Sequence, residues 1–188
     1  MKHMFKLPLV AVAALASSPA FAHPGSAAHT FADGMAHPLT GADHLMVMIA
    51  VGLFAATRPL SRAWQAPAVF LAALLAGSLA GVTYGASLAV EPLVTASLFA
   101  FAGLLLFASR VDERYALMLI ATFGLFHGYA HGGEAGSAPF GFCAGMLATS
   151  AVLHLAGLGF GARLFQSRGG RLAAALGLGA AGLALSLA

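Results

Sequence analysis

Long apolar stretches alternate along the chain with short polar segments, and this pattern predicts helices that cross a membrane. A transmembrane helix needs about 20 mostly apolar residues, and six stretches approach or exceed this length. They cover residues 40–56, 64–86, 92–108, 115–129, 140–161 and 172–187. Because no strand-like alternation is found, we predict an all-α integral membrane protein. Its six transmembrane helices would form one domain over residues 37–188.

The start of the chain is a separate segment. Two lysines precede a short apolar core, and residues 20–22 read Ala-Phe-Ala, a small-x-small cleavage pattern. We therefore predict a cleaved signal peptide over residues 1–22, with an uncleaved first membrane helix as the alternative. Cleavage would leave residues 23–36 as a short polar segment outside the cytoplasm, with His23 as the new amino terminus.

Composition supports a membrane protein and argues against nucleic-acid binding. The chain is 60% hydrophobic and 8% charged, whereas soluble domains carry about 25% charged residues. Its net charge of +3 comes from basic residues scattered between apolar runs, which form no stripe that could follow a phosphate backbone. A single cysteine excludes an internal disulfide.

The arginines predict the orientation in the membrane. All of them follow the first, third or fifth predicted helix: Arg58, Arg62, Arg110, Arg114, Arg163, Arg168 and Arg171. The other connections hold Glu91 and Glu134 and no Lys or Arg. The positive-inside rule places the arginine-bearing connections in the cytoplasm. In a bacterial inner membrane, both ends of the mature chain would then be periplasmic.

Two polar motifs interrupt the apolar pattern. Residues 37–44 read His-Pro-Leu-Thr-Gly-Ala-Asp-His, and residues 126–134 read Phe-His-Gly-Tyr-Ala-His-Gly-Gly-Glu. The predicted topology puts both motifs at the outer ends of their helices, although they are far apart in sequence. Ionisable residues at membrane depth are rare and mark functional sites. We predict one divalent-metal site with these ligands: His37, Asp43, His44, His127, His131 and Glu134.

Several of these residues have other interpretations. Residues 40–43 match a capping box, in which Asp43 would only satisfy helix N–H groups, and His44 could sit at the lipid headgroups. Three additional candidate metal ligands also have alternative, structural interpretations. His23 could belong to a solvated tail, Glu91 could be an exposed cap, and His154 could be a buried, hydrogen-bonded histidine.

Glycines recur every fourth residue on the second and fifth predicted helices. This spacing is typical of helices that pack closely in lipid. The residues are Gly77, Gly81 and Gly85, then Gly141 and Gly145, and also Gly157 and Gly161.

The two motifs carry a family resemblance. His-Pro-x-x-Gly-x-Asp-His, followed by Met48 and Val51-Gly52, resembles the HupE/UreJ family of hydrogenase and urease accessory membrane proteins. The motif at 126–134 and the mature start His23-Pro24-Gly25 are also similar. The resemblance implies a nickel permease, not an enzyme, that serves nickel-enzyme maturation proteins. It also implies that the six predicted ligands handle Ni²⁺, with Glu91 at a matching acidic position.

The residues alone leave alternatives to this function. A membrane-embedded zinc-dependent hydrolase could use the same ligands to activate water, and a non-transporting protein could donate metal to an assembly partner. Co²⁺, Zn²⁺ and Cu²⁺ share these ligands with Ni²⁺. No nucleotide-binding motif is present, so transport would be facilitated or coupled to an ion.

Overall fold

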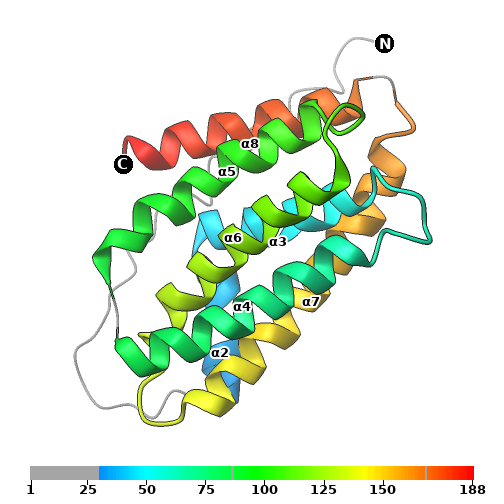
Figure 1. The fold of residues 1–188 in the computed structure, drawn as a ribbon. Coiled ribbons are helices and arrows are strands. Elements are labelled where there is room, and N and C mark those ends of the chain that lie inside the picture. Colours follow the sequence, from blue (N-terminus) through cyan, green and yellow to red (C-terminus); the bar gives the residue numbers. More distant parts are fainter. Residues whose placement is uncertain (1–29, 86, 168) are drawn as a thin grey trace, which may run out of the picture.

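The computed structural model describes residues 30–188 apart from 86 and 168, and every regular element in this part of the chain is helical (Figure 1). The all-α prediction is therefore confirmed. The predicted signal peptide and His23 lie outside the described residues. The elements are α2 (Phe31–Thr40), α3 (Ala42–Ala55), α4 (Gln65–Tyr84), the 3₁₀ turn η1 (Leu88–Val90), α5 (Glu91–Leu106), α6 (Glu113–Gly132), α7 (Pro139–Leu164) and α8 (Gly170–Ser186).

Two helices of the described chain, α4 and α7, are long and apolar enough to cross a membrane individually. Helices α2 and α3 pass the same test only together, and they are bent by 87° at the break between them. Helices α5 and α8 are shorter apolar helices of 16 and 17 residues. Length and composition thus support two spans, or three with the bent pair.

Helix α2 begins earlier than the apolar pattern indicated. The Thr30 side chain accepts a hydrogen bond from the backbone N–H of Asp33, and the Asp33 carboxylate accepts one from the backbone N–H of Thr30. This reciprocal arrangement satisfies two N–H groups at the helix start. Residues 31–36, expected to be part of a polar external segment, are therefore helical.

The capping box considered at residues 40–43 is wrong. The N-cap of α3 is Gly41, which provides no side-chain hydrogen bond. The Thr40 hydroxyl instead donates to the carbonyl oxygen of His37. The Asp43 carboxylate does accept the backbone N–H of His44, but it also contacts the His44 ring, so satisfying a helix N–H group is not its only role.

Glycines let α4 and α6 pack against each other along their lengths (Figure 1). A Cβ atom at Gly77 would collide with the carbonyl oxygen of Leu125, and one at Gly128 would collide with that of Leu74. This confirms close packing for the glycine stripe on α4. Gly85, at the end of the stripe, instead ends α4 with φ 86°, a left-handed conformation that favours glycine.

Consecutive helices from α3 to α8 run in opposite directions, so their connections alternate between two ends (Figure 1). The α3–α4, α5–α6 and α7–α8 connections share one end, which carries the described arginines. The start of α3 and the end of α6 lie at the other end, where the two polar motifs meet.

Candidate metal centre

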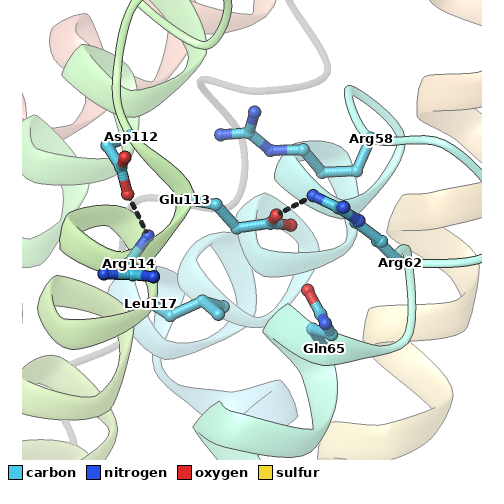
Figure 2. A pocket seen from close by; sticks show the side chains of 7 residues that line it. All are labelled: Arg58, Arg62, Gln65, Asp112, Glu113, Arg114 and Leu117. Atoms are coloured by element: carbon cyan, nitrogen blue, oxygen red, sulfur yellow. Dashed lines mark hydrogen bonds and ion pairs between the residues drawn. The ribbon is translucent and has the colours of Figure 1, made fainter.

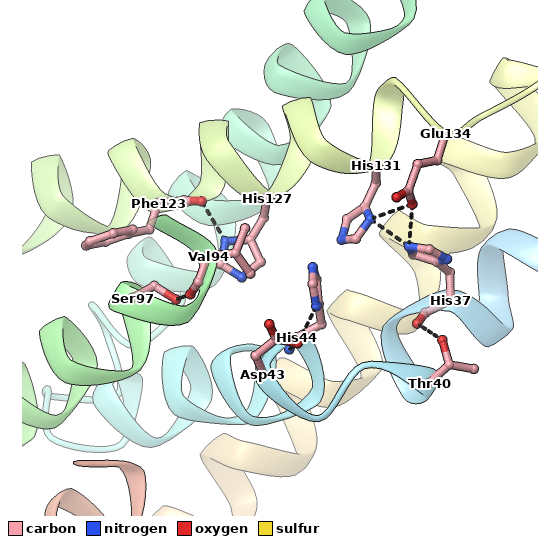
Figure 3. A network of polar contacts seen from close by, with 10 residues as sticks. All are labelled: His37, Thr40, Asp43, His44, Val94, Ser97, Phe123, His127, His131 and Glu134. Atoms are coloured by element: carbon pink, nitrogen blue, oxygen red, sulfur yellow. Dashed lines mark hydrogen bonds and ion pairs between the residues drawn. The ribbon is translucent and has the colours of Figure 1, made fainter. Parts of the chain in front are cut away.

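Three side chains from the two motifs converge at the end of α6 (Figure 3). His37 Nε2 lies 2.6 Å from His131 Nδ1, although the two residues are 94 positions apart in sequence. A carboxylate oxygen of Glu134 lies 3.4 Å from the same His37 nitrogen and 3.6 Å from the same His131 nitrogen. One ligand atom from each residue therefore falls within 4.8 Å of the others. We call these three residues the rim cluster.

The three side chains of the rim cluster differ in their exposure to solvent. The side chain of Glu134 is 49% exposed and that of His37 is 27% exposed, whereas that of His131 is only 6% exposed. Glu134 lies two residues after Gly132, the last residue of α6. A cation arriving from solvent would thus meet a carboxylate first and a buried imidazole last.

The bend between α2 and α3 brings His37 to this position. Pro38 lies inside α2, and the chain turns at Gly41, so His37 and His44 come from helices of different direction. Two contacts with α7 hold α2 in place. The Thr149 hydroxyl donates to the carbonyl oxygen of Met35 over 2.9 Å, and the backbone at Gly34 lies directly against the carbonyl group of Phe142.

His44 adjoins the rim cluster from below and is fixed by Asp43 (Figure 3). The ring centroid of His44 is 4.3 Å from that of His131. Its Nδ1 lies 2.6 Å from the Asp43 carboxylate, which also accepts the backbone N–H of His44. His44 is only 9% exposed and faces other histidines, so it points into the helix bundle rather than toward lipid headgroups.

Two further histidines are buried deeper. His127 lies one turn before His131 on α6, with its ring 5.2 Å from that of His44. Its Nδ1 lies 2.8 Å from the carbonyl oxygen of Phe123. His154 of α7 has its Nδ1 2.7 Å from the carbonyl oxygen of Met48. The hydrogen-bonded interpretation of His154 is therefore confirmed for one of its two ring nitrogens.

The other candidate ligand described by the structure is not part of this group. Glu91 begins α5 and is exposed, and among the described residues it has no hydrogen bond or ion pair with the rim cluster.

Two phenylalanines that no sequence motif singled out pack against the histidines. Phe142 of α7 lies 5.2 Å from His37 between ring centroids. The Phe70 ring of α4 lies 5.6 Å from His127 and 5.3 Å from His154. Both phenylalanines are at most 1% exposed. Nothing in the chain distinguishes them from the other 12 of its 14 phenylalanines, since only the packing of the helices brings them next to imidazoles.

The opposite end of the helices has a different character. A pocket of about 500 Å³ opens there (Figure 2), lined by Arg58, Arg62, Gln65, Asp112, Glu113, Arg114 and Leu117. Arg62 and Glu113 form an ion pair of 2.8 Å across it. The three arginines outnumber the two acids, so this pocket does not suit a cation as the rim cluster does.

The fold and the cluster define an all-helical membrane protein with histidines and carboxylates gathered among its helices. The chain belongs to the HupE/UreJ family, since it matches the family described as HupE / UreJ protein over residues 10–187. It is 34% identical over 177 residues to Protein HupE of Rhizobium leguminosarum bv. viciae, a match that covers 92% of each chain. No solved structure matches the chain. The family resemblance of the two motifs is thus confirmed.

Proposed function

We propose that this protein is a secondary transporter that takes up Ni²⁺ across the bacterial inner membrane for the maturation of hydrogenase or urease. Membership of the HupE/UreJ family points to nickel handling in hydrogenase or urease maturation, as an accessory protein rather than an enzyme. The observation that carries the proposal is the rim cluster, with ligand atoms of His37, His131 and Glu134 within 4.8 Å of one another. Two imidazoles and one carboxylate form a donor set that suits Ni²⁺ and related divalent ions.

In this proposal the chain crosses the membrane six times, through α3 to α8, and the rim cluster faces the periplasm. This orientation is supported by the arginines in the connections at the opposite end, since positive residues are retained on the cytoplasmic side. The signal peptide predicted over residues 1–22 would deliver the mature amino terminus to the same periplasmic side.

The proposed mechanism begins with capture at the rim. Glu134, the most exposed of the three side chains, attracts the hydrated cation by its charge. His37 and His131 then replace water molecules with nitrogen ligands, and His44 stands next to His131 to accept the ion further in. Asp43 orients His44 and contributes negative charge beside it.

The test is nickel entry into liposomes that contain only the purified protein. A chelating dye trapped inside reports Ni²⁺ entry, with Co²⁺ and Zn²⁺ measured on the same preparation. We expect Glu134→Gln and His131→Ala each to lower the initial rate by about tenfold or more, because each removes a ligand or its charge. Glu113→Gln is the matched control, since it neutralises a carboxylate at the opposite end and should leave the rate unchanged.

The same preparation separates the rival functions. A metal donor would bind nickel without transporting it when no assembly partner is present. A zinc-dependent hydrolase would turn over amide or ester lipids and would not need a nickel gradient. Uptake that is equal in wild type and in both rim variants, at equal protein level, would contradict the proposal.

A further inference from the structure

Three buried histidines below the rim cluster share one arrangement of their ring nitrogens. In His44, His127 and His154 the Nδ1 atom faces an acceptor, which is a carboxylate for the first and a backbone carbonyl for the other two. In all three the Nε2 atom is buried and has no hydrogen-bond partner. Buried polar atoms are almost always paired, so three such atoms on neighbouring helices require an explanation.

The hydrogen bond at Nδ1 determines whether the Nε2 atom of the same ring carries a proton or a free lone pair. A carbonyl oxygen only accepts hydrogen bonds, so Nδ1 of His127 and of His154 must carry the proton. In a neutral imidazole the Nε2 atom then has a bare lone pair, which is the form that binds a metal ion. Metal-binding histidines commonly donate the other N–H to a carbonyl or carboxylate in this way. The structure therefore presents Nε2 lone pairs already prepared as ligands.

These lone pairs follow one another into the bundle. Met48, whose carbonyl holds His154, lies one turn beyond His44 on α3, a rise of about 6 Å. The Phe70 ring packs edge-on against both His127 and His154, so these two histidines share one aromatic neighbour. His154 is 1% exposed and lies on the central, apolar part of α7.

A second orphaned group lies beside His154. Ser150 is one turn earlier on the same face of α7, and helical side chains lean toward the amino terminus of their helix. The Ser150 hydroxyl is fully buried and has no hydrogen-bond partner, unlike the buried Ser78 of α4, which donates to the carbonyl of Leu74. An imidazole nitrogen and a hydroxyl oxygen on successive turns of one face of α7 are thus both unpaired.

We propose that His154 Nε2 and Ser150 Oγ form an inner station where the divalent cation pauses after leaving the rim cluster. This inference rests on the proposed transport function and specifies its path. Two neutral protein ligands bind weakly, and weak binding suits a station that the ion must leave again for conduction to continue. The charged carboxylates remain at the rim, so the ion is held more tightly at entry than at the inner station.

The test uses His154→Asn in the full-length protein reconstituted in liposomes. The asparagine amide N–H can occupy the place of Nδ1–H and keep the hydrogen bond to Met48, whereas the Nε2 ligand is lost. We expect the initial rate of Ni²⁺ entry to fall about tenfold or more. Nickel affinity at the rim, titrated in detergent, and the thermal unfolding midpoint should both stay at wild-type values.

Ser150→Ala provides an independent variant, because removing an unpaired hydroxyl breaks no hydrogen bond. It should slow nickel entry several-fold without changing rim affinity, and Ser78→Ala is its matched control with an unchanged rate. Wild-type rates in both His154→Asn and Ser150→Ala would overturn the inner station and leave the transport function intact. A misfolded His154→Asn together with a normal Ser150→Ala would also overturn it, as a purely structural role. If the wild-type protein binds nickel but moves none, the proposed function fails and the inner station fails with it.

Discussion

Asp43 and His44 are adjacent in sequence but have different roles in the structure. The Asp43 carboxylate accepts a hydrogen bond from the backbone N–H of His44 over 2.8 Å. The same carboxylate oxygen lies 2.6 Å from Nδ1 of the His44 ring. His44 therefore keeps its Nε2 directed toward the other histidines. Because a carboxylate that orients an imidazole also strengthens it as a metal ligand, Asp43 contributes through His44 as well as through its own charge.

Replacing Asp43 by Asn tests this orienting role. An amide of the same shape carries no charge and can present either N–H or C=O to His44, so the ring is no longer held in one orientation. We expect the nickel affinity of the purified protein to fall about 10-fold to 100-fold, measured by titration in detergent. Asp112→Asn is the control, because Asp112 accepts the backbone N–H of Arg114 at the opposite end of α6 and Asn can do the same. Equal affinities in the two variants would refute the orienting role.

At the scale of helices, the break at Gly41 is the feature that sequence patterns did not reveal. The apolar pattern predicts a helix only from residue 40 onward and leaves residues 23–36 as a short polar segment. In the structure the polar residues belong to α2, whose small residue Gly34 packs on α7. Contacts between helices, which no local pattern encodes, stabilise a helix there despite Pro38 in its interior.

Helix packing at the glycines can be tested by adding one methyl group. Gly77→Ala would push a Cβ atom into the backbone of Leu125 on α6, and such overpacking costs about 1–3 kcal/mol. Gly159→Ala is the matched control in α7, because nothing lies within 4 Å of its added Cβ. Alanine also favours helix by up to about 1 kcal/mol over glycine. We expect thermal unfolding in detergent to shift down for Gly77→Ala and to stay level or shift up for Gly159→Ala.

If both alanine variants unfold at the same temperature, the close approach of α4 and α6 does not contribute to stability. The comparison depends only on the added methyl group, since both positions are interior to long apolar helices.

Across the whole molecule, charge is separated between the two ends. Among the described residues, the arginines and the Arg62–Glu113 ion pair lie at one end, whereas the rim cluster, Asp43 and His44 lie at the other. The sequence predicted this separation because loops alternate between two sides of a helical bundle, and that rule needs no knowledge of packing. It could not predict the ring contacts of Phe70 or the free Nε2 atoms, which arise only where four helices meet.

The separation of charge between the two ends also predicts the orientation of the protein in the membrane, which cysteine labelling can test. Ser61 in the α3–α4 connection and Ser137 in the α6–α7 connection are both exposed, whereas the native Cys143 is buried. In a Cys143→Ala background, Ser137→Cys should react with a membrane-impermeant maleimide in intact spheroplasts. Ser61→Cys should react only after permeabilisation, because its connection carries Arg58 and Arg62 and is held in the cytoplasm. The reverse pattern would put the rim cluster on the cytoplasmic side, where it would serve efflux or delivery instead of capture from outside.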